Sequence, residues 1–287
     1  AFSYSASSFH QGEADPTPTI TGTTGGTFSA TPSGLSINTS TGTIDLDNSN
    51  IQSYTITYTV SGVSANQTLA VTASPFVANN FSMNFDSASS QYIDAGTGLG
   101  NFLGDNYSGS LSASLWFKRA TSGNQGILSI TSGGWGEFNI ICLGNNIRFA
   151  INATAYYIIH DSSTGYSFDT DWHHIAAVMT PNSGLLDIKL YFDGQELSIT
   201  PQGSQPSTAN MDFANNQLLI GAWSTGAFYF DGKLDEVAIW NTELGETAIQ
   251  EIYNATANNT GKALDLNTDS GNYTSSANLQ YWNRLGD

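Results

Sequence analysis

The chain has 287 residues, and its 24 acidic side chains against 7 lysines and arginines give a formal net charge of −17. A surface this acidic repels nucleic-acid phosphates and anionic lipid headgroups, so we expect no nucleic-acid binding and no membrane attachment. No run of about 18 apolar residues occurs, so we also expect no membrane insertion. Cys142 stands alone between apolar residues, which predicts a buried thiol and no disulfide.

Residues 1–76 are predicted to form a first domain built of β-strands. Tyr54–Val60 and Gln67–Ala73 alternate apolar and polar residues, which is the period of a strand with one face on a core. Shorter runs of the same kind are separated by proline and glycine turns. About seven strands at this spacing in about 75 residues are typical of a compact immunoglobulin-like sandwich.

One motif in this first domain resembles modules of surface proteins. Gly34–Ile37 (Gly-Leu-Ser-Ile), followed by Thr41–Ile44 (Thr-Gly-Thr-Ile), is similar to immunoglobulin-like repeats of bacterial surface proteins. The stretch from Pro18 to Leu46 is also similar to modules in virion proteins of marine bacteriophages. The resemblance implies a spacer or stalk that is displayed on a bacterial cell surface or on a virion.

Residues 77–256 are predicted to form a second domain, because Ser74-Pro75 ends the last strand of the first. From Phe81 to Ile239, strand-like runs are separated by glycine turns and no helical period intervenes. This pattern excludes a βαβ architecture and favours two stacked antiparallel sheets. The residues predicted to form the core are Trp116, Trp172, Ile175, Val178, Leu190, Phe192, Leu219 and Ile239.

One helix is predicted, and it lies near the C-terminal end of the second domain. Glu246–Asn254 places Ala248, Ile249, Ile252 and Tyr253 on one face, which is the 3.6-residue period of an amphipathic helix. Residues 257–287 are polar and end in a segment with aromatic side chains. We expect this tail to pack on the sandwich or on a neighbouring molecule.

The stretch Tyr229–Asn241 predicts a further strand with one buried face. Apolar residues alternate there with polar ones, but the acidic pair Asp235-Glu236 interrupts the pattern. A carboxylate in such a strand needs a partner, because an unpaired buried charge is costly or becomes protonated. A cation is one such partner, and backbone amides are another.

This strand and four further segments follow one another in the order and spacing of a known family. The four segments are Met83–Asp86 with Gln91–Asp94, Leu111–Phe117, Asp171–Ala176 and Leu190–Gly194. They resemble the laminin-G-like, concanavalin-A-like jelly rolls over about residues 77–256. The predicted fold class is therefore all-β: an immunoglobulin-like sandwich, then a laminin-G-like jelly roll with one short helix near the C-terminus.

The resemblance implies a structural Ca²⁺ ion. Matching positions in the family place its ligands at Asp86, Asp94 and Asp235. Calcium takes 6–8 oxygen ligands from carboxylates and carbonyls, which fits these residue types. The alternative is that Asp235 accepts hydrogen bonds from nearby backbone amides and holds no metal.

Carbohydrate binding is a second function that the resemblance implies, since jelly rolls bind sugars with exposed aromatic side chains. The aromatic candidates in this chain are Trp135, Tyr156, Tyr157, Tyr166, Trp223 and Phe228. Each of them could equally pack at a sheet edge or at an interface with another protein.

An enzyme is the rival class, because concanavalin-like folds include glycoside hydrolases. The paired-acid strand motif of retaining members, Glu-x-Asp-x-x-Glu, does not occur in the sequence. We therefore predict a non-enzymatic extracellular protein for structure or attachment, such as a virion decoration or fibre component. The alternative is a glycan-binding adhesin of a bacterial surface, and a hydrolase ranks below both. The predicted partners are glycans or other surface proteins, in a homo-oligomer or a larger assembly.

Overall fold

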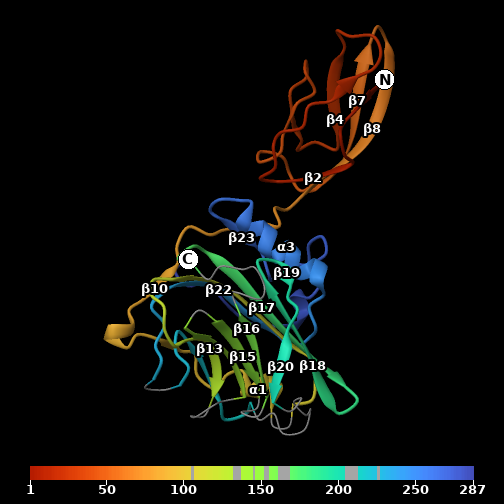
Figure 1. Ribbon diagram of the computed structural model, residues 1–287. Helices are drawn as coiled ribbons and strands as arrows, with labels where there is room; N and C mark the ends of the chain where they lie inside the picture. The colour runs from red at the N-terminus through yellow and green to blue at the C-terminus, as the bar shows by residue number, and fades with distance from the viewer. Residues whose placement is uncertain are drawn as a thin grey trace. The chain divides into compact units, whose positions relative to one another are not determined.

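The computed structural model describes residues 1–104, 107–131, 137–144, 146–151, 155–160, 169–203, 213–224 and 227–287. The chain divides into two compact units, Ala1–Pro75 and Phe76–Asp287, both drawn in Figure 1. Strands dominate the described structure, and the main helix is α3 at Glu246–Ala257, so the prediction of an all-β chain with one short helix is confirmed. Within the described ranges, no helix has the length and apolar character that crossing a membrane requires.

The first unit is built of strands around its own core. Its main sheet has the order β2-β8-β7-β4, with β2 parallel to β8, and β1-β3 and β5-β6 form two small sheets. Alternate residues of β7, namely Tyr54, Ile56 and Tyr58, are buried, as the alternation predicts. The strands are β1 Phe2–Ser3, β2 Ser8–His10, β3 Thr19–Ile20, β4 Thr27–Thr31, β5 Ser36–Ile37, β6 Ile44–Asp45, β7 Gln52–Val60 and β8 Val63–Thr72. The immunoglobulin-like character of this unit stays a prediction.

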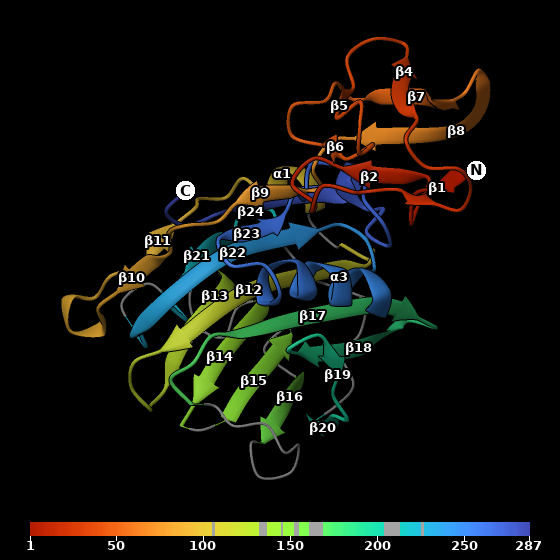
Figure 2. The same cartoon turned by 90° about the horizontal axis from the view of Figure 1, so that it is seen from above.

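The second unit contains two seven-stranded antiparallel sheets (Figure 2). The sheet that we call the helix-side sheet has the order β10-β22-β12-β17-β18-β19, and β24 pairs with β22. Its strands are β10 Met83–Phe85, β12 Leu111–Arg119, β17 His173–Asn182, β18 Leu185–Phe192, β19 Gln195–Glu196, β22 Gly232–Trp240 and β24 Leu279–Asn283.

The far sheet has the order β11-β21-β13-β14-β15-β16-β20. Its strands are β11 Ile93–Asp94, β13 Gln125–Thr131, β14 Phe138–Leu143, β15 Asn146–Ile151, β16 Ala155–His160, β20 Thr200–Gly203 and β21 Gln217–Ile220. A one-turn helix, α1 at Gly100–Leu103, lies between β11 and β12 along the chain.

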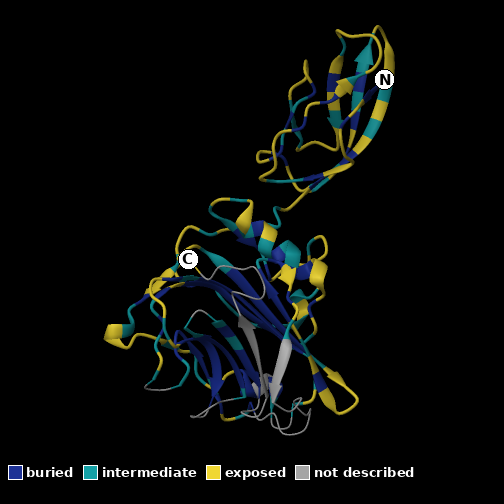
Figure 3. Ribbon diagram, in the orientation of Figure 1, coloured by how far each residue is buried: buried dark blue, intermediate teal, exposed yellow. Residues whose placement is uncertain are grey.

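One continuous apolar core lies between the two sheets. Leu115 and Phe117 of β12 contribute to it from the helix-side sheet, and Ile140 of β14 and Phe149 of β15 contribute from the far sheet. Figure 3 shows the central strands as buried along their length. Of the predicted core residues, Ile175, Leu190, Phe192 and Ile239 lie in this core.

The outer face of the helix-side sheet is covered by helix α3. Ala176, Val178 and Trp240 of this face pack with Ile249 and Ile252 of α3 in a second apolar cluster. The helical period predicted this packing, because it places the apolar residues of α3 on one side. The middle of β17 and the end of β22 are therefore buried on both faces, and this is why the continuous apolar runs Ile175–Met179 and Val237–Trp240 occur there.

A β-bulge in β22 explains the acidic pair. Ser114 of β12 faces Ala238, whereas Trp116 faces Asp235, so the register shifts between them. Glu236 has φ 49°, a left-handed backbone conformation that is uncommon for residues other than glycine. The bulge inserts one residue, so the apolar alternation resumes at Val237 and Ile239.

The residues after α3 return to the sandwich. β23 at Lys262–Leu264 pairs with β9 at Phe76–Ala78, and β24 adds to the edge of β22. Trp282 and Arg284 then reach the bulge: the Trp282 indole donates to Glu236 Oε2 at 2.6 Å, and Arg284 Nε donates to Glu236 Oε1 at 3.3 Å. The tail thereby supplies the partners of a carboxylate that is 6% exposed.

Candidate functional site

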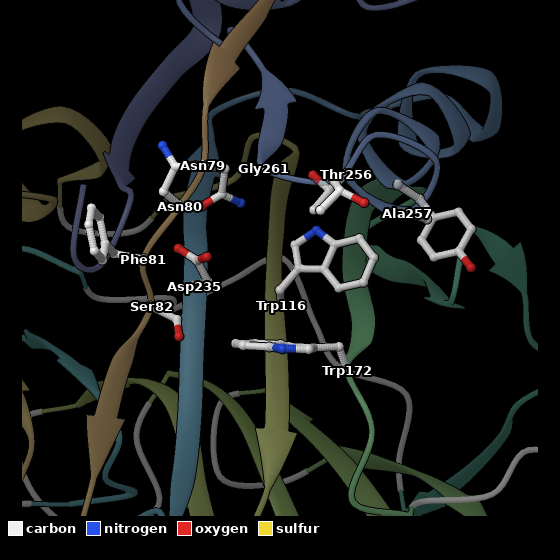
Figure 4. A pocket seen from close by; sticks show the side chains of 12 residues that line it. Asn79, Asn80, Phe81, Ser82, Trp116, Trp172, Asp235, Thr256, Ala257 and Gly261 are labelled. Carbon is white, nitrogen blue, oxygen red and sulfur yellow. The ribbon is translucent and has the colours of Figure 1, made fainter.

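A pocket of about 490 Å³ opens on the outer face of the helix-side sheet, beside the C-terminal end of α3. One wall is the connection between β9 and β10, the other is the end of α3 with the loop that follows it, and β12 and β22 form its floor (Figure 4). We call it the helix-end pocket. It is lined by Asn79, Asn80, Phe81, Ser82, Trp116, Trp172, Asp235, Tyr253, Thr256, Ala257, Thr260 and Gly261.

Trp116 is the central aromatic residue of the pocket. Its neighbours Leu115 and Phe117 point into the main core, so strand alternation places Trp116 on the outer face. Its ring stacks on Tyr253 of α3, with centroids 5.5 Å apart and an angle of 14° between the planes. The side chain is 6% exposed, and its Nε1 has no hydrogen-bond partner within the described chain. This N–H is a donor without an acceptor at the wall of a cavity.

Asp235 supplies the carboxylate of the pocket and is 5% exposed. Oδ1 accepts the Glu236 backbone N–H at 2.8 Å, and Oδ2 accepts the Asn79 amide at 3.0 Å when that amide nitrogen faces it. Burial, and then the nearby Glu236 carboxylate, raise the pKa of Asp235 to about 7. Each oxygen still has a lone pair for a ligand, because a carboxylate oxygen accepts two hydrogen bonds.

Trp172 and Asn80 complete the arrangement around the pocket. Trp172 precedes β17 and is half-buried, and its ring lines the pocket with that of Trp116 (Figure 4). Asn80 lies on the opposite wall, where its amide provides one donor group and one acceptor. The pocket thus combines aromatic rings with a buried carboxylate and side-chain amides.

His174 of β17 lies beside Trp116 on the neighbouring strand and does not line the pocket. Its ring lies 5.3 Å from that of Trp116 and 6.0 Å from that of Tyr253. Neither ring nitrogen has a hydrogen-bond partner within the described residues, and burial lowers the pKa of His174 to about 4. The imidazole is therefore neutral at physiological pH and packs as an apolar ring.

The predicted calcium ligands lie on different elements. Asp86 caps a 3₁₀ turn at Ser87–Ser89, where it accepts hydrogen bonds from the backbone of Ala88 and the hydroxyl of Ser89. Asp94 of β11 belongs to the far sheet and accepts from Gly96 and Gln217. In the part of the chain that the structure describes, no three acidic, histidine or cysteine side chains form a metal-binding group. Calcium binding by Asp86, Asp94 and Asp235 stays a prediction.

Two of the predicted sugar-binding aromatics lie together, outside the helix-end pocket. The rings of Trp223 and Phe228 are 4.9 Å apart, and Phe228 is 42% exposed. Tyr156 and Tyr157 belong to β16, where they pair with β15 and β20, and their side chains lie outside what the structure describes. Trp135 and Tyr166 lie outside the described residues altogether.

Of the residues of the helix-end pocket, Asp235 was predicted as a site residue, a calcium ligand, and the others were not predicted as a site. Trp116 and Trp172 were predicted as core residues; Trp116 is indeed buried, but on the outer face, and Trp172 is half-buried at the pocket. The outward position of Trp116 follows from the alternation Leu115-Trp116-Phe117, which is a signal within the sequence. The approach of Asn80 and Tyr253 to Trp116 has no such signal, because these residues are far apart in the chain.

Comparison with known proteins gives the family. The sequence profile of the concanavalin A-like lectin/glucanases superfamily matches residues 86–250, which is more than half of the chain. The chain belongs to this superfamily, and the predicted jelly-roll resemblance is confirmed. Comparison with curated protein sequences finds no significant match.

Solved structures are similar in fold at low sequence identity. A protein from Bacteroides ovatus, described as a candidate carbohydrate-binding protein, matches with a TM-score of 0.59 and 13% identity, over 99% of this chain and 88% of its own. A heptameric SAP-like pentraxin from Limulus polyphemus matches with a TM-score of 0.43 and 17% identity, over 51% of this chain and 70% of its own. The CBM40 of Ruminococcus gnavus IT-sialidase, bound to α2,3-sialyllactose, matches with a TM-score of 0.35 and 12% identity, over 62% of this chain and 95% of its own.

Proposed function

We propose that the protein is a non-catalytic attachment protein that binds carbohydrate in the helix-end pocket. The observation that carries this proposal is the combination of Trp116 and Trp172 with the buried carboxylate of Asp235 in one cavity. Apolar faces of sugar rings pack on aromatic side chains, and sugar hydroxyls donate to carboxylates and bond to amides. Small-molecule sites generally combine an apolar lining with a few placed polar groups in this way.

The superfamily and the fold support this proposal. The family description names lectins, and the solved structure with a TM-score of 0.59 is described as a candidate carbohydrate-binding protein. The acidic, lysine-poor composition also favours a ligand without phosphate groups.

Display outside the cell is the second part of the proposal. The first unit acts as a spacer that carries the jelly roll away from a virion or from a bacterial cell surface. Its support is the resemblance of residues 18–46 to modules of virion and bacterial surface proteins. Assembly into many copies would serve such a role, since a shallow sugar site binds weakly by itself.

Hydrolysis is the competing function, because the superfamily also includes glucanases. A retaining glycosidase needs two carboxylates about 5–5.5 Å apart on either side of the scissile bond. Among the described residues that line the helix-end pocket, Asp235 is the one carboxylate. The adjacent Glu236 carboxylate is held by Trp282 and Arg284. This arrangement favours binding over cleavage.

A structural calcium ion at Asp86, Asp94 and Asp235 is kept as a separate proposal. If it forms, removal of calcium with a chelator lowers the melting temperature, because a ligand that binds only the folded state stabilises it. An unchanged melting temperature with millimolar calcium and with chelator would exclude it.

A glycan-binding assay with two sets of variants tests the proposed function. The full chain is applied to an array of plant, bacterial and animal glycans, and the bound glycans are then titrated against Trp172→Ala and against Trp223→Ala. We expect Trp172→Ala to abolish most of the binding. Loss of binding only in Trp223→Ala would place the site at the Trp223–Phe228 pair instead. Absence of any bound glycan, or steady release of reducing sugar, would overturn the proposal.

A further inference from the structure

The charge of the helix-end pocket limits the class of sugar that fits it. Among the described residues that line the pocket there is one carboxylate, Asp235, and no lysine, arginine or histidine. Arg284 of the tail pairs with Glu236 and with Asp287 Oδ2 at 2.9 Å. Asp287 is itself joined to Asn79, whose amide reaches both Asp235 and Asp287. The side chains that line the pocket therefore include one carboxylate and no cation that could offset an acidic ligand.

The carboxylate of Asp235 is placed as a paired acceptor. It is held at one oxygen by the Glu236 backbone and at the other by the Asn79 amide, so its orientation is fixed before a ligand arrives. One lone pair remains on each oxygen. Two neighbouring hydroxyls of one sugar ring can donate to these two oxygens together, whereas a ligand without such hydroxyls leaves the buried carboxylate without new partners.

The indole of Trp116 supplies the matching donor. Its Nε1 has no partner within the described chain although the side chain is 6% exposed. Figure 4 shows this nitrogen on the side of the ring that is nearest Thr256, another residue that lines the pocket. An unpaired buried N–H is costly, so a ligand acceptor that reaches this nitrogen at the wall of the pocket gains a hydrogen bond. Sugar hydroxyl and ring oxygens are such acceptors.

We infer that the helix-end pocket selects neutral sugars with adjacent hydroxyls, bound by Asp235 and Trp116, and rejects sialylated, sulfated and uronic-acid sugars. The inference rests on the proposed carbohydrate-binding function and specifies its ligand class. A ligand carboxylate or sulfate would lie against Asp235 and lose its water without gaining a cation, and like charges brought together in a site are strongly unfavourable.

Matched sugar pairs test this inference with the full chain. Isothermal titration at pH 8.5, above the pKa of about 7 at which Asp235 ionises, compares glucose with glucuronic acid, galactose with galacturonic acid, and lactose with 3′-sialyllactose, each presented as a methyl glycoside or free oligosaccharide. For at least one pair we expect the neutral member to bind at least about tenfold more tightly. Asp235→Asn should weaken binding of the neutral sugar by about tenfold, and it should reduce the difference in affinity between the neutral and the acidic sugar of the pair. Asp187→Asn is the matched control, because it also removes one acid but outside the pocket. It should change neither the affinity for the neutral sugar nor the difference in affinity within the pair.

The outcomes separate this inference from the proposed function. An acidic sugar that binds as tightly as its neutral partner, and whose binding is lost in Trp172→Ala, would refute the inference and leave the proposed function standing. Neutral-sugar binding that is unchanged in Asp235→Asn would refute the role of Asp235. If no glycan binds, both the proposed carbohydrate-binding function and the inference about neutral sugars are refuted. Circular dichroism of each variant verifies the fold, and Asp235→Ser is the second variant if Asp235→Asn does not fold.

Discussion

The ring of Trp116 lies almost parallel to that of Tyr253, with centroids 5.5 Å apart and a 14° angle between the planes. This stack joins β12 to α3 and forms one side of the helix-end pocket. Tyr253 also covers Gly194, where a Cβ atom would lie 2.8 Å from Tyr253 Cδ1. This aromatic pair therefore adds to the apolar cluster of α3 in holding the end of the helix, and it shapes the pocket.

Replacement of Tyr253 tests the stack directly. We expect Tyr253→Ala to lower the free energy of unfolding by about 1–3 kcal/mol, since it removes a half-buried aromatic ring and the stacking contact of that ring with Trp116. It should also weaken glycan binding, because the pocket loses one wall. Tyr253→Phe keeps the ring and is the control. Urea unfolding gives the stability, and equal values for the Ala and Phe variants would contradict the role of the stack.

The pair Glu236–Arg284 offers a second stability test. We expect Arg284→Met to destabilise the protein by about 1–3 kcal/mol, because it leaves the buried Glu236 carboxylate with the Trp282 indole as its remaining side-chain partner. Glu236→Gln in the Arg284→Met background should recover part of this loss, since a neutral amide is less costly to bury. A double-mutant cycle measures the coupling, and strictly additive effects would argue against it.

The pH dependence of stability reports on His174. Burial lowers its pKa to about 4 from an ordinary value of 6.5, although Asp193 acts in the opposite direction. The stability gained by keeping this imidazole neutral is fully present above pH 6.5. It is lost as the pH falls from 6.5 towards 4, because the unfolded chain then binds a proton that the folded protein does not. Between pH 6.5 and pH 4 we expect the free energy of unfolding, measured by urea unfolding, to fall by on the order of 3 kcal/mol more in wild type than in His174→Phe.

His173 provides the contrast for that measurement. Burial lowers its pKa, but hydrogen bonds to Asp193 and Asp169 outweigh this, and the net pKa is raised. Its contribution is therefore present below pH 6.5 and is lost as the pH rises through the folded-state pKa. Urea unfolding of His173→Gln should differ from wild type most at low pH, the reverse of His174→Phe. Parallel pH curves for wild type and both variants would contradict these assignments.

Copy number should control attachment. We expect a multimer of the full chain, made by fusion to an oligomeric carrier, to bind a glycan-coated surface about 10²–10⁴ times more tightly than the monomer. The reason is that, once one copy in the multimer has bound the surface, the other copies bind it in an intramolecular step at high effective concentration. Surface plasmon resonance at matched site concentration measures the ratio. Equal affinity of monomer and multimer would show that a single pocket suffices.

The two units should fold separately. Ala1–Pro75 and Phe76–Asp287 each contain their own apolar cluster, so we expect the separately expressed fragments to give cooperative thermal transitions. Limited proteolysis should cut between β8 and β9 rather than within β9, which is paired with β23. A fragment that is unfolded alone would show that the units depend on one another.

The sequence by itself determined the sandwich and its helix. Leu115-Trp116-Phe117 and Val237-Ala238-Ile239 alternate with the period of a strand, and Ala248, Ile249 and Ile252 recur with the period of a helix, so local patterns were enough to predict these elements. The pairing of β24 with β22 could not be predicted, because hydrogen bonds between strands that are far apart in the sequence leave no local sequence pattern.

Only the tertiary structure decided what Trp116 and Asp235 do. From the sequence, Trp116 was predicted as a core residue and Asp235 as a metal ligand or an acceptor of backbone amides. Their shared cavity depends on where the end of α3 and residues 79–82 cross the sheet, and the bulge at Glu236 turns both acids to the outer face. Such a site is formed by side chains that are distant in sequence and near in space. Its geometry follows from packing between elements, which the pattern within any one element does not contain.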